Sequence, residues 1–203
     1  MAQKPDFRDI WREVKLRSNL IGCVLLWSMC SFNFYMLTFF MKYFPGNIFE
    51  NSLCFAFSDL IAFTLSGLVI RYTTVVRGYK LAFLISSIGG LLYILFSNMP
   101  VLIPVFLCLS RMGVTMAFNM GYISVPRLFP IKFQSTVYAI VNLFAHIIAC
   151  FAPLVAEIPP PVPFIAYLSA IAISVLATSA LNEIDGAGAV QKSASGKEKT
   201  HNV

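Results

Sequence analysis

Residues 133–156 read FQSTVYAIVNLFAHIIACFAPLVA, and this stretch contains no Asp, Glu, Lys or Arg. A helix of about 20 apolar residues crosses the roughly 30 Å of hydrocarbon in a bilayer. Outward from this stretch, further apolar blocks of similar length lie at residues 18–43, 48–71, 80–98, 101–127 and 162–182. The sequence therefore predicts six transmembrane helices joined by short connections.

The composition of the whole chain agrees with this prediction. The protein has 203 residues, of which 58% are hydrophobic and 12% are charged, and its mean hydropathy is +0.78. A single soluble core of this size cannot bury so much apolar surface, and the strands of an outer-membrane barrel would alternate instead of giving unbroken apolar runs. We predict an all-α membrane protein in contact with membrane lipid.

The basic residues indicate the sidedness of the spans. Of the 15 Lys and Arg residues, 13 fall at the N-terminus, in the connections after the second and fourth spans, or in the C-terminal tail, whereas Lys42 is alone on the opposite side. This bias places both termini on the cytoplasmic or an equivalent side, in a plasma or organelle membrane. The net charge of +6 does not indicate a nucleic-acid partner, because the charges flank the spans.

Two segments flank the six-helix region, which we place at residues 18–185. In residues 1–17, Phe7, Ile10, Trp11 and Val14 follow helical spacing, which predicts a short amphipathic helix at the cytoplasmic-equivalent interface. Residues 186–203 are rich in Gly, Ala, Ser and Lys, which predicts a disordered polar tail.

Several short motifs follow one another in the order of a known family. They are Arg111-Met112-Gly113-Val114-Thr115, Arg127-Leu128-Phe129-Pro130 and Ala152-Pro153-Leu154, preceded by Trp27 and Tyr35 at a matching spacing. In their order and spacing the chain resembles the C-terminal six-helix half of a major facilitator superfamily transporter, and within that superfamily the organic cation/anion transporter family. Such transporters bind substrate near the midplane, between two six-helix halves.

The resemblance implies a half-transporter. A small organic solute, with organic cations as one candidate class, would cross the membrane when the chain pairs with another six-helix half, either a different gene product or a second copy of itself. A partial product of a longer transporter gene is a further reading, against which the initiating Met1 weighs mildly.

Away from their ends, the predicted spans contain three residues of the Asp, Glu, Lys, Arg and His types, namely Asp59, Arg111 and His146. Helix rise places them about 18, 24 and 21 Å above the inner boundary, so an Asp59–Arg111 pair is expected. The residues alone leave two readings open: a translocation role, or an ion pair that locks two helices together and a histidine hydrogen-bonded to a neighbouring helix.

The resemblance assigns these residues to substrate binding. Asp59 and Arg111 match an acidic residue and an arginine of the family, and His146 falls at a position that helps to set substrate charge. Trp27 and Tyr35 would join the site if they face the cavity, since aromatic rings suit apolar or cationic ligands.

The inner connections depart from the family. Arg71 and Arg127 stand where the resemblance leads one to expect acids, and Gln134 stands where it leads one to expect an arginine. Two arginines at an inner gate repel each other unless another acid meets them. The alternative function is therefore a structural or accessory subunit of a larger membrane complex, such as an energy-transducing assembly, in which these arginines contact acids or anionic lipid head groups such as cardiolipin.

Enzyme chemistry is not expected. Metal-binding His-x-x-x-His, nucleophile-elbow, P-loop and dinucleotide fingerprints do not occur in the sequence, so we expect no cofactor and no metal. The five cysteines lie in apolar blocks without a Cys-x-x-Cys pair and are interpreted as small hydrophobic residues.

Overall fold

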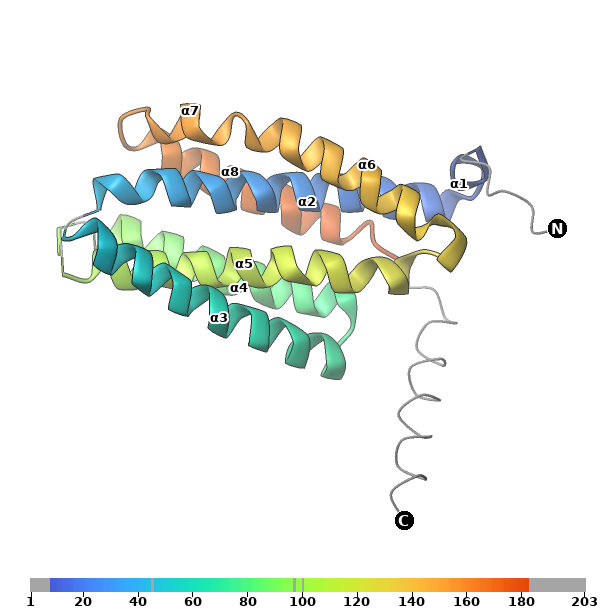
Figure 1. Ribbon diagram of the computed structural model, residues 1–203, viewed down its shortest axis with the longest axis horizontal. Helices are drawn as coiled ribbons and strands as arrows, with labels where there is room; N and C mark the ends of the chain where they lie inside the picture. Colours follow the sequence, from blue (N-terminus) through green and yellow to red (C-terminus); the bar gives the residue numbers. More distant parts are fainter. Residues whose placement is uncertain (1–7, 45, 97, 100, 183–203) are drawn as a thin grey trace, which may run out of the picture.

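The computed structural model describes residues 8–44, 46–96, 98–99 and 101–182. All regular elements in these ranges are helical and form one elongated bundle (Figure 1). In chain order they are α1 (Arg8–Arg12), α2 (Val14–Phe40), the 3-10 helix η1 (Met41–Tyr43), α3 (Ile48–Tyr72), α4 (Val75–Leu95), α5 (Ile103–Leu128), α6 (Ile131–Ala149), α7 (Ala152–Ala156) and α8 (Val162–Thr178). The all-α class is as expected.

Within the described ranges, five segments are long and apolar enough to cross a membrane. They are Val14–Tyr43, Ile48–Tyr72, Val75–Leu95, Ile103–Leu128 and Ile131–Ala156. The protein is accordingly a multi-pass membrane protein.

The last apolar helix is shorter than predicted. Helix α8 ends at Thr178 after 17 residues, which span about 26 Å, because the chain turns at Ser179 and Ala180. The predicted span at 162–182 is therefore too long at its C-terminal end, and α8 falls below the length of the five candidate spans.

The N-terminal boundary also differs from the prediction. A bend at Glu13 separates α1 from α2, and α2 begins at Val14, so the predicted start of the first span at residue 18 is four residues too late. Within α1, Ile10 is fully buried while Trp11 is 47% exposed. Residues 1–7 of the predicted amphipathic helix and the predicted tail at 186–203 lie outside the described residues.

The helices pack as two groups that meet where α2 contacts α5 and where α4 contacts α8. Helices α3 and α4 lie against α5, whereas α6, α7 and α8 lie against α2 (Figure 1). Glycine permits the closest approach: a Cβ atom on Gly113 of α5 would lie 2.5 Å from the backbone nitrogen of Ser86 on α4. Gly113 therefore serves the close packing of α5 against α4.

The start of α2 and the end of α8 lie at the same end of the bundle (Figure 1). Ser18 Oγ donates a hydrogen bond to the carbonyl of Ala180. Asn19, which is fully buried, donates from Nδ2 to the carbonyls of Leu128 and Asn182 and accepts from the Asn182 amide. One asparagine thus connects α2, the end of α5 and the chain beyond α8.

Candidate functional site

A bidentate ion pair joins α3 to α5 inside the bundle. Arg111 Nη2 lies 3.0 Å from Asp59 Oδ2, and Arg111 Nε lies 3.0 Å from Asp59 Oδ1. The two side chains are 5% and 19% exposed. The expected pair is present, and its parallel hydrogen bonds are the strong geometry for a guanidinium and a carboxylate.

The remaining polar atoms of the pair also have partners. Arg111 Nη1 donates to the Phe34 carbonyl at 2.9 Å and to Thr38 Oγ1 at 2.5 Å, both on α2. Thr115 Oγ1 donates to Asp59 Oδ1 at 2.6 Å, and the guanidinium carbon lies 3.6 Å from the centroid of the Phe34 ring. The network therefore joins α2, α3 and α5, and it satisfies both charges without a solute.

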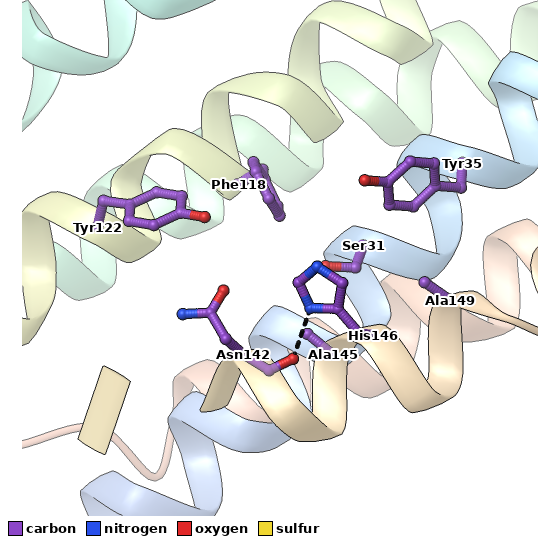
Figure 2. A pocket seen from close by; sticks show the side chains of 8 residues that line it. All are labelled: Ser31, Tyr35, Phe118, Tyr122, Asn142, Ala145, His146 and Ala149. Atoms are coloured by element: carbon purple, nitrogen blue, oxygen red, sulfur yellow. Dashed lines mark hydrogen bonds between the residues drawn. The ribbon is translucent and has the colours of Figure 1, made fainter. Parts of the chain in front are cut away.

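A pocket of about 220 Å³ lies beside this network, between α2, α5 and α6 (Figure 2). Helix α6 contributes the small residues Ala145 and Ala149, which leave the space open, and polar and aromatic side chains form the rest of the wall. The lining residues are Ser31, Tyr35, Phe118, Tyr122, Asn142, Ala145, His146 and Ala149.

The hydrogen bond of His146 fixes which of its nitrogen atoms meets the pocket. Nδ1 lies 2.7 Å from the carbonyl of Asn142 on its own helix. A carbonyl only accepts, so Nδ1 carries the hydrogen, and in the neutral ring Nε2 is an acceptor. Figure 2 shows this nitrogen turned into the pocket. Of the readings left open for His146, the hydrogen bond to a neighbouring helix does not hold, because the ring bonds to the i−4 carbonyl of its own helix instead.

Asn142 presents a second acceptor. Its Nδ2 donates to the carbonyl of Tyr138 at 2.8 Å, and its amide oxygen is turned toward Tyr122 (Figure 2). The hydroxyl groups of Tyr35 and Tyr122 point toward the pocket centre from α2 and α5 (Figure 2). The α6 wall therefore offers acceptors and the opposite walls offer phenols.

The structure divides the five predicted substrate-binding residues into three groups. Tyr35 and His146 line the pocket. Trp27 is 4% exposed and lies behind the wall, edge-on to Tyr122 at a centroid distance of 4.5 Å. Asp59 and Arg111 are outside the lining, and Phe34, which lies against the Arg111 guanidinium, stacks on the lining ring of Phe118.

Sequence reasoning missed several lining residues, among them Ser31, Phe118 and Tyr122. Phe118 and Tyr122 are four residues apart on α5, so they share one helix face, and both contact Trp27. The i, i+4 spacing of two aromatic residues was the available signal.

The predicted inner-side residues lie outside the pocket lining, near the end of the bundle at which α3 and α5 end and α6 begins. Arg71 is exposed in the last turn of α3, with its guanidinium carbon 5.9 Å from the Tyr72 ring centroid. Arg127 is half-buried in the last turn of α5. Gln134 Nε2 donates to the carbonyl of Phe129 at 3.1 Å, which stabilises the turn between α5 and α6.

At the opposite end of the bundle, an ion pair joins η1 to the residue that follows α7. Lys42 Nζ contacts Glu157 Oε1, and Tyr43 donates from its hydroxyl to Glu157 Oε2 at 2.7 Å. The hydrogen bonds from Lys42 and Tyr43 lower the pKa of Glu157 below its usual range. Both partners of the ion pair are about half exposed, so its contribution to stability is small.

Comparisons with known protein families and with curated proteins find none that matches the chain. Among the described residues, His, Cys, Asp and Glu side chains do not form a group of three or more that would hold a metal ion.

Proposed function

We propose that this protein takes part in the transmembrane transport of a small organic solute, as a half-size membrane protein that works with a partner half. The observation that carries the proposal is the polar, aromatic pocket between α2, α5 and α6. Its lining residues Tyr35, Tyr122 and His146 are exposed on the side of the bundle.

Hydrocarbon is an unfavourable neighbour for this face. Hydroxyl, amide and imidazole groups lose hydrogen bonds when lipid covers them, so protein or water is the favoured covering. The resemblance to major facilitator transporters supports the same arrangement, since their solute sites lie between two halves. Basic residues at the inner ends of α3 and α5 favour placing that end of the bundle, with both termini, on the cytoplasmic-equivalent side.

The test has two steps. The chain is extracted from its native membrane in mild detergent, separated on a native gel, and its companions are identified by mass spectrometry. A small complex with one other six-helix protein, or with itself, is the expected result. Uptake by that complex in proteoliposomes should then fall with His146→Ala and persist with Leu143→Ala, a matched control whose side chain is 60% exposed on the same helix. Unchanged uptake with His146→Ala would reject the site.

A second function has an observation of its own. Every polar atom of the Asp59–Arg111 network has a partner inside the protein, so the network needs no solute. This favours an accessory subunit of a larger membrane complex, for instance an energy-transducing assembly, with Arg71 and Arg127 meeting acids or anionic lipid head groups. Migration on the native gel with a large multi-subunit assembly would support this function.

A further inference from the structure

We propose that the pocket between α2, α5 and α6 binds a small uncharged, planar molecule that carries N–H or O–H donors. The inference rests on the proposed function in one respect: it takes this pocket as the solute site. It adds the chemical class of the solute, and it departs from the organic cations that the family resemblance implies.

The pocket wall lacks a permanent charge among the described residues. Behind the Phe34 and Phe118 rings lie the charged groups of Asp59 and Arg111. Their oxygen and nitrogen atoms are already hydrogen-bonded to each other, to Thr115 and to α2. An ion that entered the pocket would lose hydration without gaining a counter-ion, which is costly. A neutral molecule avoids this cost.

The aromatic walls are poorly placed to attract a cation. Ring faces do bind cations, but the guanidinium of Arg111 already lies 3.6 Å from the Phe34 centroid. Phe34 in turn stacks on Phe118, with centroids 5.8 Å apart and planes inclined by 21°. Arg111 contacts α2, which forms one wall of the pocket, whereas Asp59 lies on α3, which does not line the pocket. The positive end of the ion pair is therefore the end on the side of the pocket. A cation bound on Phe118 would therefore lie on the same pair of stacked rings as the Arg111 guanidinium, and the two positive charges would repel each other.

The polar atoms of the wall favour a ligand with donors. His146 Nε2 and the Asn142 amide oxygen are acceptors on α6, whereas the hydroxyls of Tyr35 and Tyr122 donate or accept from the opposite walls (Figure 2). The volume of about 220 Å³ is below the roughly 300–1,000 Å³ of sites for drug-sized ligands. A single planar ring system with an amide or similar group suits both the size and the hydrogen-bonding pattern.

Three probes of one shape test the charge preference. Benzamide is neutral, benzamidinium is the corresponding cation, and benzoate is the anion. Their binding to the full chain, purified with its native companions, is measured by saturation-transfer NMR and competition at pH 7.5. Benzamide is expected to bind at least about tenfold more tightly than either ion. Equal or tighter binding of benzamidinium or benzoate would overturn the inference, as would the absence of benzamide binding to a folded complex.

Two variants test the location. Asn142→Leu keeps the side-chain volume but removes the acceptor, and His146→Phe keeps a ring but removes Nε2, so each is expected to weaken benzamide binding at least about fivefold. Leu143→Ala, at an exposed position on the same helix outside the pocket lining, should leave binding unchanged. Unchanged binding in both pocket variants would overturn the assignment, and a near-ultraviolet circular dichroism spectrum identifies any variant that is unfolded.

The probes separate this inference from the proposed function. Preferential binding of benzamide without uptake of any solute would reject transport and leave the ligand class standing. Uptake of a permanent organic cation that is lost with His146→Phe would support transport and reject the neutral ligand class.

Discussion

Removing one partner of the Asp59–Arg111 pair should destabilise the protein far more than removing both. Asp59→Leu leaves the guanidinium, whose side chain is 5% exposed, without its carboxylate. Arg111→Met leaves the carboxylate with Thr115 alone and also removes the hydrogen bonds to Phe34 and Thr38. An unpaired charge near the centre of a membrane helix costs roughly 2.5–3.5 kcal/mol, so each single variant should lose about 3 kcal/mol of unfolding free energy.

The double variant tests the reasoning directly. Asp59→Leu combined with Arg111→Met removes both charges and fills the space with apolar atoms, an exchange that is often neutral or stabilising. We expect a loss of about 1 kcal/mol or less, mainly from the hydrogen bonds to α2, and therefore a coupling of several kcal/mol between the two sites. Unfolding of the purified chain in mixed micelles, with increasing sodium dodecyl sulfate, measures all four corners of the cycle.

Additive losses in this cycle would refute the ion pair as the element that compensates both charges. The same double variant also tests the role of the pair in transport when uptake is measured. Solute uptake that persists after both charges are removed would assign the pair a purely structural role, while its loss in a folded protein would return Asp59 and Arg111 to the transport pathway.

Three further predictions concern packing, polar connections and pH. Gly113→Ala should cost about 1–3 kcal/mol of unfolding free energy, because its Cβ would meet the backbone of α4. The matched change Gly67→Ala, whose Cβ has nothing within 4 Å, should be neutral or stabilising by up to about 1 kcal/mol. Thermal unfolding compares the stabilities of the two variants. Asn19→Ala leaves buried carbonyls without donors and should cost about 1–3 kcal/mol, which the same melts measure. The pKa of Glu157 is lowered in the folded state. Its pairing with Lys42 therefore stabilises the protein at pH values above the ordinary pKa of a glutamate, about 4.3, and this stabilisation is lost as the pH falls through the lowered pKa. Glu157→Gln should therefore flatten the fall in melting temperature between pH 6 and 3, and an unaltered slope would contradict this.

The sequence was sufficient to predict features that depend only on the length of each helix and on position along it. Counting residues from the basic ends placed Asp59 and Arg111 at similar depth, and the structure has them 3.0 Å apart. Five of the six predicted apolar blocks correspond to long candidate spans among the described residues, whereas the sixth forms the shorter helix α8. These inferences depend only on the helix rise and on the cost of charge in hydrocarbon, which hold for any apolar helix.

The pocket wall needed information that a sequence pattern lacks. Phe118 and Tyr122 belong to it because α5 turns that face toward α2 and α6, and the close α4–α5 contact at Gly113 fixes that rotation. Trp27 was expected in the site, but the same rotation puts it behind the α5 aromatics. The face that a helix presents to a cavity follows from helix packing, which hydrophobicity alone does not determine when apolar residues surround the helix.

The two sides of the bundle require different surroundings, and this decides which measurement separates the functions. Helix α3 exposes apolar side chains such as Leu53, Phe57 and Leu60, which suit lipid. The face with Tyr122 and His146 exposes polar groups that lipid does not satisfy. A partner protein would cover that face in a transporter and in an accessory subunit alike, so the presence of a partner does not discriminate between them. The occupant of the pocket does: a space that holds a solute which the intact complex also takes up favours transport, while a pocket filled by side chains of the partner favours the accessory role.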